Sequence, residues 1–140
     1  MDSHPNIMEP DLLVGGPPCQ GHSDLNNHTR REDSRNNLYF RMLRAAQILS
    51  PKAVIIENVS TVVHSKEKVV QRTRKNLEKL GYKVAERILL GHHFGVPQKR
   101  ERLIMIGVKN SIKKDLVFPD PSHGDGKYPK VTLGKVIDSL

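Results

Sequence analysis

Short apolar runs alternate with amphipathic stretches along this chain, and their spacing predicts an α/β protein. The runs are short enough to be strands, and they fall at residues 12–14, 53–56, 82–90 and 103–108. Ala53–Ile56 contains no polar alternation, which is typical of a central parallel strand that is covered on both faces. Leu12–Val14 is likewise interpreted as a buried strand.

Helical periodicity fills the intervals between these strands. The first helix is predicted to be capped by Asp33 or Ser34, and its apolar face consists of Leu38, Met42, Ala45, Ala46 and Leu49. The second is predicted over residues 65–80, stopped by Gly81, with an inward face of Val69, Val70, Thr73, Leu77 and Leu80. A last short helix is predicted between a Thr132 cap and Leu140. This order of elements is that of half a doubly wound sheet.

The first strand breaks into Gly15-Gly16, which let the backbone turn sharply, and then into Pro17-Pro18, which fix φ. Cys19, the only cysteine of the chain, follows at once and is therefore held at a rigid position beyond a strand end. Catalytic groups and ligands gather at such positions in open α/β sheets. A lone cysteine is more often a small buried hydrophobe, but this polar setting favours a nucleophile.

Three segments near predicted strand ends carry a family resemblance. Gly15–Ser23 is similar to the nucleophile motif of the DNA cytosine-5 methyltransferases. Glu57-Asn58-Val59 and Phe94–Arg102, which contains a Gln-x-Arg-x-Arg pattern, resemble two further motifs of that family and follow in its order. His22 departs from the family's usual aromatic residue. The resemblance implies a Rossmann-like methyltransferase fold and makes residues 1–140 the catalytic half of a doubly wound, mostly parallel sheet.

The resemblance also implies a role for each matching residue. Cys19 would add to carbon 6 of cytosine, Glu57 would neutralise N3 as an acid, and Arg100 and Arg102, two apart and expected on one side, would hold the base carbonyl. The remaining assignments are supporting roles for Gln98, Asn58, Gln20 and Pro18, cofactor contacts for Leu38 and Pro17, and DNA contacts for Ser23, Arg30 and Arg31.

The methyl donor of the family is S-adenosylmethionine, and its Gly-rich loop is expected before Asp11, where only ten residues without glycine stand. The segment that reads the DNA sequence is expected after Leu140. The chain thus resembles the middle of an enzyme from a restriction-modification or orphan bacterial system, acting on double-stranded DNA with base flipping. It could be completed by a second chain or be a non-catalytic remnant. A tRNA-methylating branch shares two motifs, but its usual pattern after the nucleophile differs.

Composition adjusts this interpretation only slightly. A net charge of +8 and an isoelectric point of about 9.8 suit a polyanionic partner. A single cysteine allows no internal disulfide and favours a reducing cytoplasm, with association to the nucleoid expected for a bacterial-type enzyme. No run approaches the roughly 18 apolar residues of a membrane span, and the start lacks signal-peptide character. The seven histidines show no ligand spacing, so no metal is expected.

Overall fold

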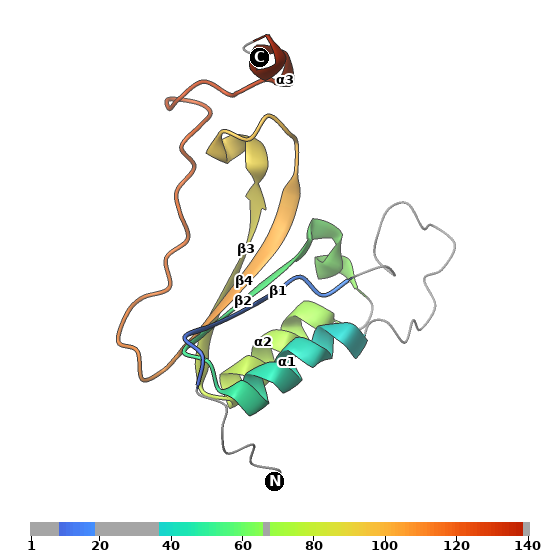
Figure 1. Cartoon of the computed structure of the whole chain (residues 1–140), viewed down its shortest axis with the longest axis vertical. Helices are drawn as coiled ribbons and strands as arrows, with labels where there is room; N and C mark the ends of the chain where they lie inside the picture. The colour runs from blue at the N-terminus through green and yellow to red at the C-terminus, as the bar shows by residue number, and fades with distance from the viewer. Residues whose placement is uncertain (1–8, 19–36, 66–67, 139–140) are drawn as a thin grey trace, which may run out of the picture.

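The computed structural model describes residues 9–18, 37–65 and 68–138 (Figure 1). Its elements are, in chain order, β1 (Leu12–Gly15), α1 (Asn37–Leu49), β2 (Ala53–Val59), the 3₁₀ turn η3 (Ser60–His64), α2 (Val69–Lys79), β3 (Tyr82–Leu90), the 3₁₀ turn η4 (Gly91–Phe94), β4 (Glu101–Lys109) and α3 (Leu133–Ile137). All four predicted strands and all three predicted helices are therefore present.

The strands form one mixed sheet in the order β1-β2-β4-β3. β1 and β2 run parallel, with Val14 opposite Ile55, as a strand–helix–strand crossover requires. β4 pairs antiparallel with both β2 and β3, and Glu57 of β2 lies opposite Ile104. The predicted α/β class is confirmed, although only one of the three strand pairs described here is parallel.

Both α1 and α2 lie on the same face of the sheet and contact each other (Figure 1). The buried core lies between them and the sheet; its members include Leu43, Ala46, Val54, Ile56, Val70, Leu77, Leu103 and Met105. Burial therefore alternates along β2, and Ile55 is only half-buried. The prediction that Ala53–Ile56 is covered on both faces was wrong, because the described residues place no helix over the second face.

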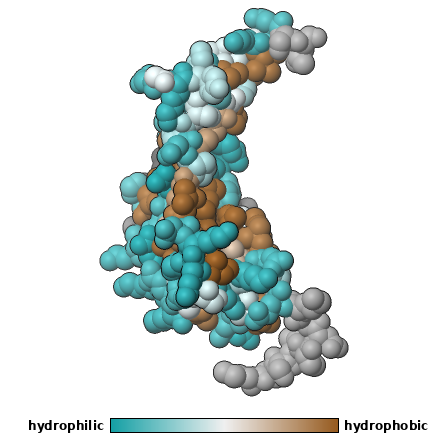
Figure 2. Space-filling view, turned by 90° about the vertical axis from the view of Figure 1, so that its left-hand side faces the viewer, coloured by the Kyte–Doolittle hydropathy of each residue, from teal (hydrophilic) through white to brown (hydrophobic). Residues whose placement is uncertain are grey.

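β1 is also less buried than predicted. Leu12 and Val14 face the uncovered side and are 48% and 61% exposed, whereas Leu13 packs against the core. Apolar (brown) surface accordingly interrupts the hydrophilic surface around the middle of the molecule (Figure 2).

The helices bury part of their predicted faces, and α1 also buries Leu43, which the prediction left out. Met42 packs against the core and Ala46 belongs to it, whereas the predicted caps of α1 lie outside the described residues. In α2 the inward residues Val69, Val70, Thr73 and Leu77 are confirmed. Leu80 was wrongly placed inward: it follows the last turn of α2 and is 36% exposed. Gly81 ends this segment with a φ of +86°, as a helix stop does.

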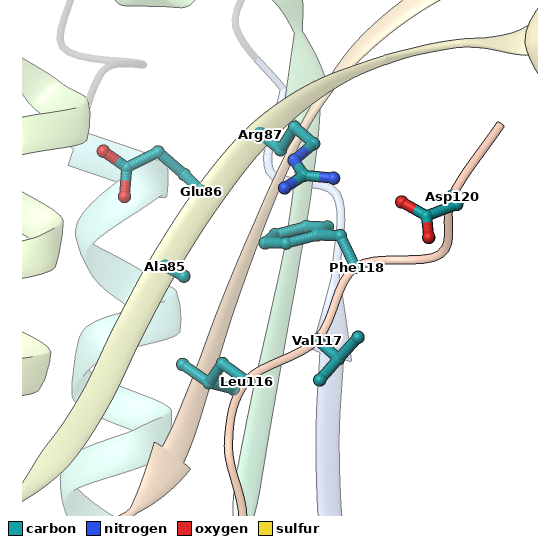
Figure 3. A pocket seen from close by; sticks show the side chains of 7 residues that line it. All are labelled: Ala85, Glu86, Arg87, Leu116, Val117, Phe118 and Asp120. Carbon is teal, nitrogen blue, oxygen red and sulfur yellow. The ribbon is translucent and has the colours of Figure 1, made fainter.

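Residues 110–130, called the strap below, run from the end of β4 along β3 towards α3 (Figure 1). The Lys83 ammonium donates to the carbonyls of Ile112 and Lys114 at 3.1 and 2.8 Å. Further along, buried Phe118 lies under the Arg87 guanidinium, 5.0 Å from the ring centroid, beside a shallow cavity (Figure 3). Thr132 caps α3 as predicted, accepting from the Lys135 amide. No helix in the described ranges is long and apolar enough to span a membrane.

Candidate functional site

The first motif continues directly from the carboxyl end of β1. Gly16, Pro17 and Pro18 are described there, whereas Cys19, Gln20, Ser23, Arg30 and Arg31 lie outside the described residues. Leu38 lies in α1, but its side chain is outside the description as well. The structure therefore describes the segment that leads to the predicted nucleophile, residues 16–18, and the position of Cys19 itself stays a prediction.

Glu57 and Arg102 form the ion pair of the site. Arg102 Nε lies 2.7 Å from Glu57 Oε1. The sheet register explains this contact, since Glu57 faces Ile104 and Arg102 faces Val59, which makes the two charged residues diagonal neighbours on one face. The Glu57 side chain is 41% exposed and the Arg102 side chain is 26% exposed, so the pair is open to a polar ligand.

The glycine segment after β1 passes close to the Glu57 carboxylate. A Cβ built on Gly16 would lie 3.1 Å from Glu57 Oε2, which is tighter than ordinary contact. The approach follows from the parallel pairing of β1 and β2, whose carboxyl ends meet at one edge of the sheet. A glycine at position 16 thus lets the segment before Cys19 run past the carboxylate.

Asn58 ties the same segment to β2. Its side chain is buried, and its Nδ2 donates to the carbonyl of Pro17 at 3.1 Å. Its Oδ1 accepts from the Val59 amide at 2.8 Å, so both ends of the side-chain amide are used. Asn58 points to the helix-covered face and holds the segment at Pro17. Its neighbour Glu57 points to the open face, where its carboxylate is accessible.

The third motif begins in the turn between β3 and β4. The Gly91 amide donates to the Arg100 carbonyl at 2.7 Å, and the Arg100 amide donates to the Gln98 carbonyl at 3.0 Å. Gln98 contacts the arginine segment through its main-chain carbonyl, whereas its side chain is exposed, and its supporting role stays a prediction. Arg100 is exposed just before β4 and forms no ion pair in the described residues, so it is not brought to Glu57 here.

One contact of this turn has no signal in the sequence. Gly95 has a φ of +80°, and a Cβ there would lie 2.8 Å from the ring of His123, which comes from the strap. The amides of Ser122 and His123 both donate to the His93 carbonyl. Nothing in the local pattern around His123 indicates a partner so distant in sequence.

The histidines do not form a metal centre in the described part of the chain. Within those ranges, no group of three or more His, Cys, Asp or Glu side chains is placed to hold an ion. His92 and His93 instead meet edge to face, with ring centroids 4.4 Å apart.

Comparison with known proteins identifies the family of the chain. The family model "C-5 cytosine-specific DNA methylase" matches residues 2–139. The chain is 36% identical to the Type II methyltransferase M1.HphI of Haemophilus parahaemolyticus and 34% identical to M.NgoFVII of Neisseria gonorrhoeae. These alignments cover 94% and 97% of this chain but only 38% of each relative.

Solved structures show the same likeness. A candidate DNA modification methyltransferase encoded within an E. coli prophage superposes with a TM-score of 0.65 at 30% identity, covering 80% of this chain and 30% of that protein. The S. pombe Dnmt2 methyltransferase superposes with a TM-score of 0.56 at 25% identity, covering 76% of this chain and 30% of that protein. From the family match, the relatives and the shared fold, this chain belongs to the C-5 cytosine-specific DNA methylases.

Proposed function

We propose that this chain is the catalytic part of a restriction-modification or orphan enzyme that transfers a methyl group from S-adenosylmethionine to carbon 5 of cytosine in DNA. The observation that carries this proposal is the convergence of the three motifs: Gly16 beside the Glu57 carboxylate, and Arg102 paired with it. The chain spans about 38% of the length of the relatives above, so the proposal concerns the complete protein.

The chemistry explains why a cysteine and a carboxyl group are needed together. Carbon 5 of cytosine is too weakly nucleophilic to accept a methyl group directly. Addition of the Cys19 thiolate to carbon 6 removes the ring's aromaticity and makes carbon 5 able to attack the donor's methyl group. After the methyl group is transferred, loss of the carbon 5 proton expels the thiolate and restores the 5,6 double bond, so that Cys19 returns unchanged.

Glu57 and the arginines would stabilise the charge that this addition creates. Negative charge develops on N3 as sulfur adds to carbon 6. A carboxyl group at N3 acts as a general acid and neutralises this charge by donating a proton. Arg102 would hold the glutamate in orientation, and Arg102 with Arg100 would donate charged hydrogen bonds to the base carbonyl. Asn58 would position the nucleophile loop through Pro17.

Pro17 is the predicted methyl-donor contact whose surroundings lie within the described residues. Pro17 is half-buried at the carboxyl end of β1, with its carbonyl held by Asn58, and so fits a wall of such a site. S-adenosylmethionine would supply an activated methyl group. This chain's residues would activate the cytosine that receives the methyl group.

The open face of the sheet supports completion by further polypeptide. Leu12 and Val14 leave the edge strand exposed, and Ile55, Ile104 and Ile106 are only half-buried on the same face. An exposed apolar sheet face and a free strand edge favour association. We infer that a complementing segment or chain covers them in the active protein, which would act on nucleoid DNA in the cytoplasm.

The Glu57–Arg102 pair provides the test of this function. In the complete protein, Glu57→Gln should lower the single-turnover methylation rate of a cytosine duplex by on the order of 10²-fold or more while duplex affinity changes little. Glu78→Gln, an exposed glutamate on α2, is the matched control and should retain the wild-type rate. An unchanged rate in Glu57→Gln would remove Glu57 from the chemistry.

A further inference from the structure

The far end of the β3–β4 hairpin is joined to the strap by specific contacts. The amides of Ser122 and His123 donate to the His93 carbonyl at 2.9 and 3.0 Å. The His123 ring lies against Gly95, where a Cβ would come within 2.8 Å. Segments about thirty positions apart in the sequence are therefore fixed side by side, as Figure 1 shows for the top of the hairpin and the chain that leads to α3.

Both joined segments carry exposed cations. Lys99 and Arg100 come from the turn before β4, and Lys127 and Lys130 come from the strap. Within the described residues, none of the four forms an ion pair, and Lys127 donates only to the Pro121 carbonyl. We call these four residues the basic tip.

The hairpin and strap parts of the basic tip both act electrostatically on His92. Burial lowers the pKa of His92 below its ordinary value, and the positive charges of His93, Lys130 and Lys99 lower it further, with Glu101 acting in the opposite direction. A hairpin lysine and a strap lysine therefore both lie within electrostatic reach of one ring. Glu101 beside the hairpin cations, and the exposed Asp120 and Asp125 of the strap, carry the opposing charge.

The basic tip also continues directly from the candidate site. Arg100 lies two residues before Arg102, and Arg102 pairs with Glu57. If a polyanion places a base at Glu57, the negative charges next to that base would lie along the hairpin end. Lysines are compact charges that bind phosphate without reading bases, so the contact they offer is independent of sequence.

We propose that the basic tip binds the phosphodiester backbone of duplex DNA next to the target base. This inference rests on the proposed function, whose substrate is DNA. It adds the surface that holds the duplex at the hairpin end and assigns Lys99 and Lys130 to it.

Fluorescence anisotropy of a labelled mixed-sequence duplex, titrated with the 140-residue chain at several salt concentrations, tests the proposal. Each phosphate contact contributes about 0.9 to the slope of log K against log salt. The double variant Lys99→Ala/Lys130→Ala should flatten that slope by up to about two and weaken binding at low salt by about 10-fold or more. Lys99→Arg/Lys130→Arg, which keeps the charges, should restore both.

The matched control removes two exposed lysines from α2, as Lys75→Ala/Lys79→Ala, and should leave the slope within about 0.5 of wild type. An equal or larger loss in this control, no measurable duplex binding by the wild-type chain, or tighter binding of an RNA hairpin than of the duplex would overturn the proposal. A flattened slope together with unchanged methylation in Glu57→Gln would instead overturn the proposed chemistry alone.

Discussion

Asn58 is the residue through which β2 holds the segment that leads to Cys19. Its buried side-chain amide joins Pro17 on one side and the backbone of Val59 on the other. A buried polar side chain is retained at little energetic cost only when its partners are present. The position of the loop before the nucleophile therefore depends on this one amide.

Asn58→Ala should destabilise the fold by about 1–3 kcal/mol, since the Pro17 carbonyl loses its donor and a small void remains. Urea unfolding followed by circular dichroism measures this change. Asn76→Ala is the control, because Asn76 makes a similar side-chain bond to the Arg72 carbonyl but at an exposed position. Equal losses in the two variants would show that Asn58 is not a special anchor.

His92 gives the stability of the hairpin end a pH dependence. Its folded-state pKa is lowered by burial and by neighbouring positive charge, whereas in the unfolded chain it is near 6.5. The unfolded state therefore binds the proton more readily, and stability falls as pH drops through about 6.5. His92→Asn should reduce the loss of urea midpoint between about pH 8 and 5.5. A variant with the wild-type pH profile would contradict this assignment.

Residue identities at the site were more predictable than residue contacts. Glu57 and Arg102 could be singled out because their motifs stand at strand ends, and the structure brings their side chains into an ion pair. The packing of His123 against Gly95 could not be predicted, because it depends on the path of the strap. The roles of Cys19 and Arg100 stay predictions.

At the scale of elements, the strap is the least expected part of the molecule. It has little secondary structure of its own, yet Lys83, Phe118 and the amide pair at residues 122 and 123 fasten it along β3. Figure 3 shows Arg87 over the Phe118 ring, whereas Glu86 points away, towards the helices, where it pairs with Arg74. Phe118 is therefore the apolar anchor that fixes the strap midway.

Phe118→Ala should loosen the strap while leaving the sheet intact. Amide hydrogen exchange at Ser122 and His123 should accelerate by about 10-fold or more, and exchange in β2 and β4 should stay unchanged. Val117→Ala is the control, since Val117 is adjacent and 77% exposed. Unaltered exchange at Ser122 in Phe118→Ala would show that the anchor lies elsewhere.

The elements themselves were well predicted from the sequence, because apolar runs and helical periodicity are local signals. Burial was less predictable. The apolar run Ala53–Ile56 predicts a strand that is covered on both faces, whereas α1 and α2 lie on the same face in the described structure. Whether a second layer covers a strand depends on polypeptide distant in sequence, which a local pattern does not report.

At the scale of the whole molecule, the described residues leave one sheet face covered and one open, and we propose that further polypeptide completes the site. The methyl donor would meet Pro17 and the strand ends but few other groups in the described residues. The isolated 140-residue chain should therefore bind S-adenosylmethionine weakly or not at all and transfer no methyl group. Titration calorimetry and a radiolabelled methyl-transfer assay measure both. Micromolar binding together with turnover would contradict this account.

The measurement that tests the central claim most directly is covalent trapping by the complete protein. With S-adenosylmethionine and a duplex that carries 5-fluorocytosine at the target, fluorine cannot leave carbon 5 as a proton does, so the adduct should persist. Mass spectrometry should locate the bond at Cys19, and Cys19→Ala should abolish the trapped species. An adduct that survives Cys19→Ala, or one on another residue, would contradict the proposed mechanism.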